Sequence, residues 1–414
     1  MDRTLSVASY RVRDLVAGDA TRWEDGALHV DLAGVERAAD ELPGLRSMTA
    51  AIVQPGESTR IASVLDVVEP TVKPANPRTT FSGHLGTLGV AGVGVSNRLD
   101  GMAVVSTIGP AEQLDRVEGL IDMGGPGAPL SYWSRTCNLV LSFDADPAAT
   151  LAEVDRSIRI ATLTVARDLA ATTVDHAPDE SESLELGPAD GGDLPSLCVV
   201  MQVASEGPGV DTLIYGAPVI GIMPVVMDAR EILDGAIVSG AYDHASVRNP
   251  TYFYQRSRLL RELIAGHGSR WWLKGVVVTL GYLNGGFEKQ RAAVLAAKLA
   301  AQLGAQGAVL TTFSSGNSHT DTMLTCRACE ELGVRTAVLI VESNGGLTDF
   351  VPEADCIVSV GNEDELIEGW HPDRTVGGRD PRVAPADDDA PVPLRDYLGA
   401  NCQLGDMPIG VEES

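Results

Sequence analysis

Gly307-Ala-Val-Leu-Thr-Thr312 is a short apolar run that precedes an amphipathic segment at Asp321–Leu332, and a second run, Thr336-Ala-Val-Leu-Ile-Val341, follows it. Unbroken apolar runs of this length are typical of strands buried on both faces of a sheet. Helical segments between such strands indicate parallel pairing, because parallel neighbours need a long crossover connection. This stretch therefore predicts a β–α–β unit of an α/β fold.

The same alternation extends through residues 196–369. The further strand candidates are Leu197–Val203, Pro218–Val226, Gly275–Leu280 and Cys356–Val360, and the further helix candidates are Phe253–Ala265 and Phe287–Leu303. We expect this region to be a Rossmann-like α/β domain with an open, mostly parallel, doubly wound sheet and flanking helices. Ligands bind such sheets near the carboxyl ends of the strands.

The rest of the chain divides into three regions with other compositions. Residues 1–174 carry short strand candidates separated by Gly, Pro and Asp clusters, together with one helical pattern at residues 148–171, so we expect a β-rich α+β N-terminal domain. Residues 175–195 are acidic and rich in Gly and Pro, which predicts an exposed linker at the domain boundary. Residues 370–414 hold many prolines and an Asp run, which favours an extended C-terminal arm.

The charge balance excludes several classes of partner. The chain of 414 residues has 57 acidic and 31 basic residues and a net charge of −26. Such an acidic protein is repelled by nucleic acid and by anionic membranes. No apolar run reaches the ~20 residues that a membrane-spanning helix needs, and the N-terminus lacks the pattern of a signal peptide. We therefore expect a cytoplasmic protein.

Six cysteines are scattered along the chain, which favours reduced thiols over a disulfide framework. Cys326 and Cys329 form a C-x-x-C pair. A zinc site would need a second pair, and a redox pair usually opens its helix, whereas this pair is expected further along a helix. We interpret it as two buried helix cysteines.

The turn after Thr312 is a candidate ligand site. Gly316 and Asn317 suit a turn with positive φ, Ser318 or Thr320 suits the cap of the following helix, and Asp321 suits its first turn. A helix N-terminus at the carboxyl edge of a parallel sheet favours an anion or carboxylate pocket. An ordinary capped turn is the alternative.

Three of the seven histidines, His84, His244 and His319, are predicted to lie in loops, and Asp243 and Asp321 are near two of them. If these loops converge, they offer the ligands that zinc or ferrous iron prefers. Singly, each histidine is an ordinary hydrogen-bonded loop residue. The glycine-rich stretch at residues 81–95 lacks the third glycine of a nucleotide-binding motif, so we interpret it as a flexible or domain-joining loop.

Several motifs together carry a resemblance to a known family. They are Gly56–Ile61 with Asp66–Pro70, Ile121–Gly127, Asp234–Gly240, Asn249–Tyr252, Gly316-Asn317 with Thr320-Asp321, and Cys356–Asn362. On these motifs the chain resembles the proproteins of glycine, sarcosine and betaine reductase component B, which are related to the D-proline reductase proprotein. The resemblance implies cleavage of an Asn-Cys bond that turns the Cys into a pyruvoyl group. Here the two positions read Ala241-Tyr242. Tyr242 cannot form a pyruvoyl group, so we expect an unprocessed chain without that cofactor.

The resemblance also implies partners and a site. A larger subunit with a redox Cys or Sec cleaves the C–N bond of a small amine or amino-acid-like substrate, within an oligomeric complex. The implied catalytic residues here are Tyr242, Asp243 and His244, and the implied substrate-binding residues are Asn249, Tyr252, Gly316, Asn317, His319 and Asp321. His319 and Asn97 depart from the family pattern, which predicts a changed pocket. The alternatives are a non-catalytic scaffold subunit, or a metal-dependent lyase or reductase that uses His84, His244 and His319.

Overall fold

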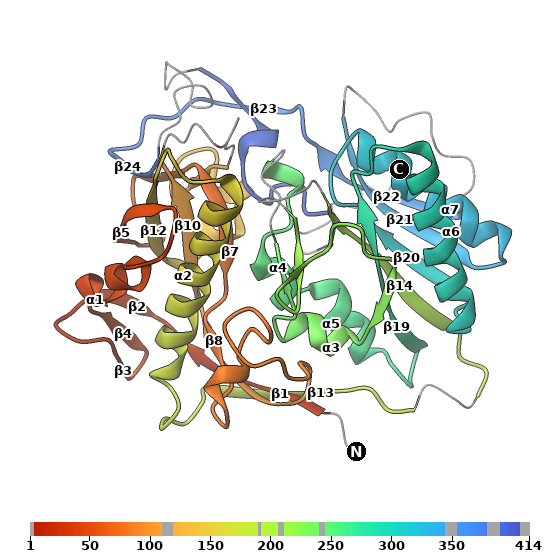
Figure 1. Cartoon of the computed structure of the whole chain (residues 1–414), viewed down its shortest axis with the longest axis horizontal. Helices are drawn as coiled ribbons and strands as arrows, with labels where there is room; N and C mark the ends of the chain where they lie inside the picture. The colour runs from red at the N-terminus through yellow and green to blue at the C-terminus, as the bar shows by residue number, and fades with distance from the viewer. Residues whose placement is uncertain are drawn as a thin grey trace.

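The computed structural model describes residues 4–109, 119–188, 192–205, 211–239, 245–343, 354–378 and 390–405. Two α/β halves lie side by side, the N-terminal half in red to yellow and the C-terminal half in green to blue (Figure 1). The prediction of an α/β protein is confirmed. Within the described ranges no helix is long and apolar enough to cross a membrane.

A six-stranded sheet forms the frame of the C-terminal half. Its order is β17 (Val225–Met227), β19 (Trp272–Gly281), β14 (Ser196–Ala204), β20 (Gly307–Thr311), β21 (Arg335–Glu342) and β22 (Cys356–Asn362). All neighbours pair in parallel except β17, which is antiparallel to β19. Five of these strands match predicted apolar runs, because a strand covered on both faces must be apolar at every position.

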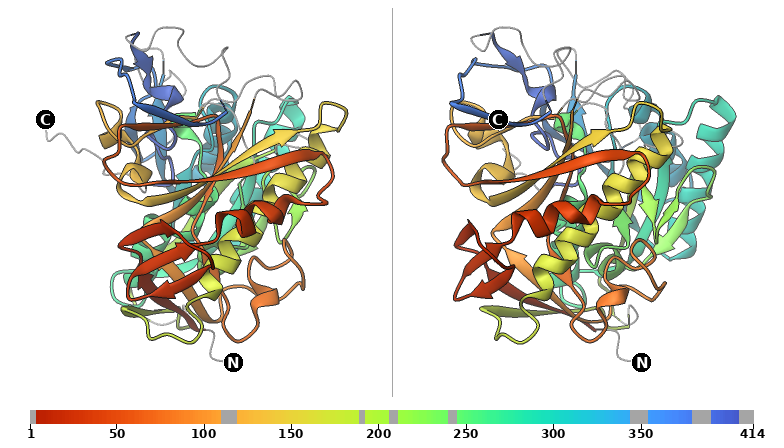
Figure 2. Two further views of the ribbon diagram at one scale, coloured as in Figure 1. Left: turned by 90° about the vertical axis from the view of Figure 1, so that its left-hand side faces the viewer. Right: turned by 60° about the vertical axis from the view of Figure 1, so that its left-hand side comes forward.

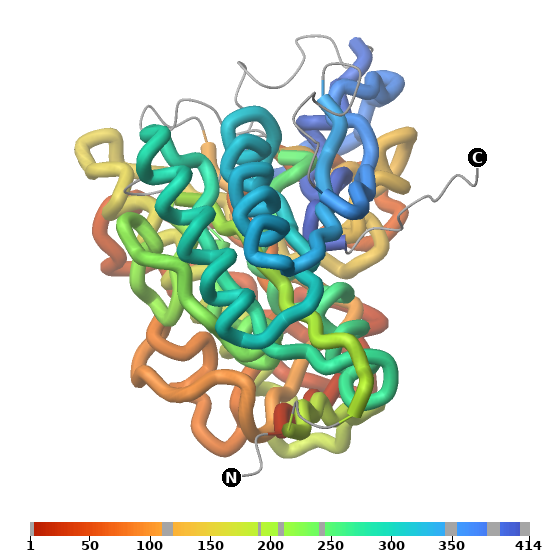
Figure 3. Tube along the Cα trace, turned by 90° about the vertical axis from the view of Figure 1, so that its right-hand side faces the viewer, coloured from red at the N-terminus to blue at the C-terminus, as the bar shows by residue number. Residues whose placement is uncertain are grey.

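Helices cover both faces of this sheet. On one face, α6 (Gly286–Gln302) and α7 (Asn317–Glu331) pack side by side over Val200 and Val277 (Figure 3). On the other face, α3 (Ala229–Leu233), α4 (Thr251–Gln255) and α5 (Arg258–Ala265) lie between the sheet and the N-terminal half (Figure 1). The apolar cluster on this second face contains strand residues of both halves, so the two halves share a core.

Two predicted elements are wrong in detail. The strand predicted at Pro218–Val226 is a turn between β16 (Ala217–Pro218) and β17, because Pro218 and Pro224 lack the N–H that a central strand donates. β16 instead joins β15 (Leu213–Ile214) and β18 (Ile237–Val238) in a small sheet. The single helix predicted at Phe253–Ala265 is divided into α4 and α5, since Ser257 caps α5 by accepting a hydrogen bond from the Leu260 N–H.

The N-terminal half holds β-sheets and one long helix, α2 (Leu151–Ala171), which lies beside the strands (Figure 2). α2 starts after a capping box formed by Thr150 and Glu153, three residues later than predicted. The other elements are β1 (Thr4–Arg11), β2 (Asp14–Ala17), β3 (Arg22–Glu24), β4 (Ala27–Val30), α1 (Leu32–Glu36), β5 (Leu45–Val53), β6 (Thr59–Ala62), β7 (Val64–Val68), β8 (Thr71–Val72), β9 (Gly94–Asp100), β10 (Met102–Ile108), β11 (Ile121–Asp122) and β12 (Cys137–Ala145). The two larger sheets have the orders β13-β1-β9-β8 and β5-β12-β10-β7.

The acidic segment 175–195 contains a strand where its composition predicts an exposed linker. β13 (Glu180–Glu185) pairs antiparallel with β1. Leu184 is buried while its neighbours Ser183 and Glu185 are exposed, so a single buried apolar residue anchors an otherwise polar edge strand. Backbone pairing with β1 supplies the order that composition alone does not predict.

The C-terminal segment packs against both halves instead of hanging free. β24 (Arg374–Gly377) pairs in parallel with β6, and β25 (Val392–Pro393) pairs with β23 (Leu366–Ile367). Tyr397 is fully buried and its hydroxyl donates to the Asp122 carboxylate at 3.1 Å. Gln403 accepts a hydrogen bond from the Val341 N–H in the six-stranded sheet. The segment 390–405 therefore ties the two halves together.

Candidate functional site

Two of the quoted motifs, at Asp66 and at Asn249–Tyr252, meet at the seam between the halves. The Asp66 carboxylate accepts a hydrogen bond from the Thr251 backbone N–H at 2.8 Å and another from the Thr251 hydroxyl at 2.6 Å. Asp66 lies on β7 and Thr251 is the first residue of α4, 185 positions later. The carboxylate thus satisfies a free N–H at the start of a helix, where negative charge is favoured.

At the same seam, the backbone N–H and the carbonyl oxygen of Ser239 are both hydrogen-bonded. Ser239 is the last described residue before position 240. Its N–H donates to the Thr251 hydroxyl at 2.9 Å. Its carbonyl oxygen accepts a hydrogen bond from Arg159 on α2. Arg159 also donates to the Asp155 carboxylate at 2.8 Å and to the Asp211 carbonyl oxygen at 3.1 Å. Side chains from β7, α2 and α4 therefore fix the chain just before Ala241-Tyr242.

A cavity of about 410 Å³ opens beside Arg159, between α2, the glycine-rich loop and the small sheet. Its lining combines charges of both signs with apolar side chains: Gly83, His84, Ala152, Glu153, Asp155, Arg156, Arg159, Ile160, Leu163, Asp211, Leu213, Gly216 and Pro218. Arg159 also borders a small space next to Asp66 and Ser239. Arg159 thus connects the cavity wall with Ser239, which itself does not line the cavity.

Burial changes the titration of two groups around this cavity. Burial lowers the pKa of His84 to about 4, so its imidazole is neutral at neutral pH. The His84 Nε2 lies 3.3 Å from the Ala236 carbonyl oxygen. Burial raises the pKa of Asp66 to about 6, against the hydrogen bonds from Thr251, which favour the carboxylate. Asp66 therefore changes charge close to physiological pH.

The glycine-rich loop docks onto the small sheet. A Cβ on Gly83 would lie 2.2 Å from the Tyr215 carbonyl oxygen, and one on Gly216 would lie 2.0 Å from the Gly83 carbonyl oxygen. Only glycines allow this approach, which places His84 in the cavity wall. Further along the loop, the Gly92 N–H donates to Asp234 at 2.7 Å. The loop therefore joins the two halves, as one of our two interpretations predicts.

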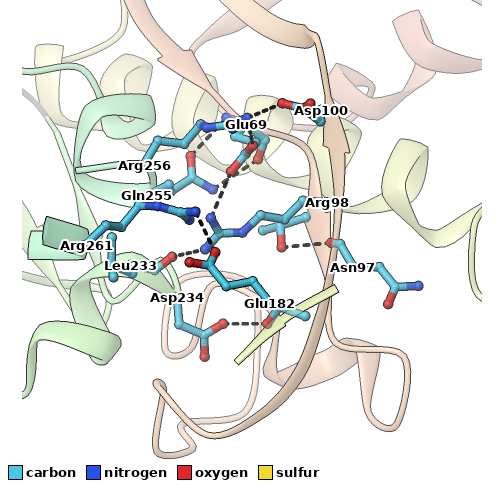
Figure 4. Close-up of polar contacts among 12 residues, drawn as sticks. Glu69, Asn97, Arg98, Asp100, Glu182, Leu233, Asp234, Gln255, Arg256 and Arg261 are labelled. Atoms are coloured by element: carbon cyan, nitrogen blue, oxygen red, sulfur yellow. Dashed lines mark hydrogen bonds and ion pairs between the residues drawn. The ribbon is translucent and has the colours of Figure 1, made fainter. Parts of the chain in front are cut away.

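A second polar cluster joins the halves away from the cavity. Glu69 is fully buried and lies 2.9 Å from Arg256 and 3.5 Å from Arg98 (Figure 4). Arg98 also donates to the Leu233 carbonyl oxygen. Asn97 is next to this cluster, and its amide donates to the Thr173 hydroxyl at 3.1 Å inside the N-terminal half. Asn97 does not line the cavity beside Arg159.

The predicted site residues fall into separate groups. Tyr242, Asp243 and His244 lie outside the described residues. Asn249 and Tyr252 are buried at the start of α4. The Asn249 side chain accepts a hydrogen bond from the Cys402 thiol at 3.6 Å. Tyr252 packs edge-on against Trp133, with ring centroids 5.9 Å apart. Neither Asn249 nor Tyr252 lines the cavity.

The other predicted residues gather at the start of α7. Gly316 has a positive φ of 59°, as predicted, whereas Asn317 is already helical. Neither Ser318 nor Thr320 caps the helix, because α7 begins before them. The Asn317 amide donates to the Leu283 carbonyl oxygen at 3.2 Å. Within the described ranges, no hydrogen bond or ion pair joins this group to Asn249 or Tyr252, and the two groups do not line a common cavity.

Asp321 and His319 have contrasting surroundings in this first part of α7. Asp321 forms an ion pair with Lys289 of α6 at 2.7 Å, and burial raises the pKa of its carboxyl. His319 is buried in the core, and burial lowers its pKa to about 4. Among the described residues, no three His, Cys, Asp or Glu side chains form a group suited to a metal ion. Neither His84 nor His319 belongs to such a group within the described ranges, and His244 lies outside them.

Comparison with known proteins shows what these elements belong to. Residues 3–386, nearly the whole chain, match the family of glycine/sarcosine/betaine reductase component B subunits. The chain belongs to this family. The glycine reductase complex component B subunits alpha and beta of Acetoanaerobium sticklandii are 32% identical over 390 residues, which cover 90% of this chain and 88% of the relative. No solved structure gives a significant match.

Two relatives from Peptoclostridium acidaminophilum carry other substrate names. Its betaine reductase complex component B subunit alpha is 32% identical over 385 residues, covering 88% of this chain and 85% of the relative. Its sarcosine reductase complex component B subunit alpha is 29% identical over 377 residues, covering 88% and 86%. This component B family member is thus similar to proteins named for three small amino compounds.

The residues that hold Ser239 in this component B family member escaped the sequence prediction. Asp155 and Arg159 stand four residues apart on α2 and are buried on a helix face that is otherwise mostly apolar. A charged pair at that spacing on a buried face was the available signal. Asp211 follows residues outside the described ranges, and nothing in its local sequence marks it.

Proposed function

We propose that this chain is the unprocessed, substrate-binding subunit of a component-B-type reductase complex, and that it binds a small amine or amino-acid-like substrate in the cavity beside Arg159. Family membership supports a place in such a complex. The observation that carries the proposal is the position of Arg159, which lines the cavity and also donates to the carbonyl oxygen of Ser239, two residues before Ala241. In this proposal the changed segment still meets the substrate.

The charges in the cavity wall suit a zwitterion. Arg156 lines the cavity and forms no hydrogen bond or ion pair with the described residues, so its guanidinium is the candidate partner for a substrate carboxylate. Asp155 and Asp211 line the same cavity and favour an ammonium group. Apolar residues such as Leu163 and Leu213 complete the wall and suit the methyl groups of an N-methylated amine.

The proposed chemistry follows from the missing carbonyl. A chain with Tyr242 cannot hold the amine as a covalent adduct, so its own part is to bind and orient the substrate. The Cys or Sec of the larger subunit attacks the carbon that bears nitrogen. A carbon–chalcogen bond forms as the C–N bond breaks, and the amine leaves with the bonding electron pair and takes up a proton. Neutral His84 in the cavity wall is a candidate to orient the leaving amine.

Intact mass spectrometry and calorimetry test the proposal on the purified full chain. We expect one polypeptide that runs through positions 241 and 242, and saturable binding of glycine, sarcosine or betaine. Arg156→Ala should weaken that binding by about tenfold or more, because a carboxylate loses a charged partner. Arg167→Ala, on the same helix but outside the cavity, is the matched control and should bind like wild type.

Two results would overturn the proposal. Recovery of two fragments, one starting near residue 242, would show processing by another route. Equal affinity of the wild type and Arg156→Ala for all three compounds, with the complex assembled and its turnover unchanged, would favour a scaffold subunit without a substrate site.

A further inference from the structure

The helix α7 begins at the carboxyl edge of the parallel sheet without a cap. It spans 15 residues from Asn317, and Gly316 precedes it with φ 59° and ψ −107°. In this fully described segment, no side chain caps the helix and the first turn holds no acidic residue; the His319 backbone N–H donates to the Gly316 carbonyl oxygen at 3.1 Å, which leaves the N–H groups of Asn317 and Ser318 free. The free N–H groups of such a terminus carry a partial positive charge. The terminus is therefore open to a negatively charged group.

Three buried polar side chains surround this terminus and lack hydrogen-bond partners. Ser314 in the preceding turn is 1% exposed, and Ser318 and His319 in the first turn are 0% and 2% exposed. The hydroxyl oxygens of both serines and both ring nitrogens of His319 have no partner in the described part of the chain. Most buried polar groups in proteins are hydrogen-bonded, and an unsatisfied one destabilises the fold.

Ser318 and His319 lie on adjacent faces of the first turn. Side chains on a helix lean toward its N-terminus, so Ser318 and His319 lean toward the turn that carries Ser314. Gln202 of β14 fixes that turn: its amide donates to the Ser318 carbonyl oxygen at 3.2 Å, and its own oxygen accepts from the Phe313 N–H at 2.9 Å. The donors are thus held in place before any ligand arrives.

The neighbouring side chains favour a negatively charged ligand over a positively charged one. Asp321 is the nearest acidic residue along the helix, and it is paired with Lys289 at 2.7 Å. The serine hydroxyls and a neutral imidazole offer O–H and N–H donors. A cation would find no unpaired carboxylate among these residues, whereas an oxyanion would meet donors and the positive helix end.

We infer that the N-terminus of α7 binds a small oxyanion, a carboxylate or phosphate group, through Ser314, Ser318, His319 and the free backbone N–H groups of the first turn. This inference goes beyond the proposed function and does not depend on it, because none of these side chains lines the cavity beside Arg159. A single bound oxyanion supplies hydrogen-bond partners to the polar side chains that the fold leaves unsatisfied.

Calorimetric titration of the full chain with inorganic phosphate, and separately with acetate, tests the inference. We expect saturable binding of at least one anion, and weakening by about tenfold in Ser318→Ala. Saturation by phosphate alone assigns a phosphate ligand, and saturation by acetate alone assigns a carboxylate. Ser131→Ala removes an equally buried hydroxyl that also lacks a partner, at a place with no long helix terminus, and should bind like wild type.

Histidine NMR gives a second readout that does not rely on variant affinity. In the 15N-histidine-labelled full chain, the ring signals that His319→Asn removes should shift with saturation in the wild type as the anion is added. Ser318→Ala should unfold at or above the wild-type temperature without anion, because it removes an unsatisfied hydroxyl. The inference fails if neither anion binds with saturation, or if folded Ser318→Ala binds as tightly as wild type.

Discussion

Arg159 on α2 donates a hydrogen bond to the carbonyl oxygen of Ser239, two residues before Ala241. This guanidinium therefore joins helix α2 of the N-terminal half to the chain at Ser239 in the C-terminal half. The same group bonds the Asp155 carboxylate at 2.8 Å. Because Arg159 is 6% exposed, water cannot replace these contacts cheaply when the side chain is removed.

Arg159→Met should therefore destabilise the fold by about 3 kcal/mol, because it leaves the buried Asp155 without its guanidinium partner. It should also weaken substrate binding in the cavity, whose wall it reshapes. Urea unfolding followed by circular dichroism gives the free energy of unfolding. Arg167→Met, whose exposed ion pair with Asp168 lies on the same helix, should change that free energy by less than about 1 kcal/mol. Equal effects of the two substitutions would contradict a special role for Arg159.

Asp66 should give the stability a pH dependence of its own. Its folded pKa is about 6, above the unfolded value of about 4, so the stability it contributes is present below pH 4 and is lost as pH rises through 6. Asp66 keeps some exposed surface, so we expect a loss on the order of 2 kcal/mol. Urea unfolding of the wild type and of Asp66→Asn between pH 4 and pH 7 gives the free energy of unfolding of each protein. The change with pH in the difference between these two free energies measures the loss.

The comparison with Asp66→Asn is needed because two histidines act in the opposite direction. The folded pKa values of His84 and His319 are about 4, so the stability they contribute is present above their unfolded value of about 6.5 and is lost as pH falls through 4. Both proteins share that contribution, and it cancels in the difference. A difference that stays constant with pH would show that Asp66 does not titrate in this window.

Glu69→Gln should weaken the contact between the halves. Glu69 is fully buried between Arg98 and Arg256, so removing its charge leaves Arg98 buried beside a neutral side chain, at a cost of about 3 kcal/mol. Glu182→Gln is the matched control, because its ion pair with Arg261 is partly exposed and should contribute less than about 1 kcal/mol. Chemical unfolding of both variants distinguishes them; a Glu69→Gln protein as stable as the control would mean that the cluster does not stabilise the seam.

The six cysteines should react in two classes. Cys356 is exposed and the other five are buried. Burial raises the pKa of Cys198 and Cys329 to about 12, so these thiols hold little reactive thiolate at neutral pH. We expect one fast equivalent with a thiol reagent in the native protein, lost in Cys356→Ser, and the full number in denaturant. Fast reaction of Cys326 or Cys329 would instead support a redox role for the C-x-x-C pair.

The six-stranded sheet was predictable, because strands buried on both faces must carry unbroken apolar runs. β14, β19, β20, β21 and β22 all show such runs. β13 was not predictable from its acidic composition, because its order comes from backbone pairing with β1 and from one anchoring side chain. Composition reports the exposed face of an edge strand and says little about its hydrogen bonds.

The candidate site was less predictable than the fold. The motifs at Asp66 and Thr251 were recognised separately, but only the tertiary structure shows that they touch. His319 was expected in a loop, whereas α7 begins early enough to bury it in the first turn. A helix boundary that shifts by a few residues decides whether a side chain meets solvent or core, and local sequence fixes such boundaries poorly.

The order of the six-stranded sheet has a consequence for any break in the chain between Ser239 and Ala245. β14 precedes that point and lies between β19 and β20, which both follow it. β24, near the other end, pairs with β6 in the N-terminal half. The two pieces of a cut chain would be interleaved, each holding strands of the other by continuous backbone ladders. Cutting the polypeptide and separating its products are therefore distinct events in this architecture, because the β-ladders hold the two pieces together across a cut.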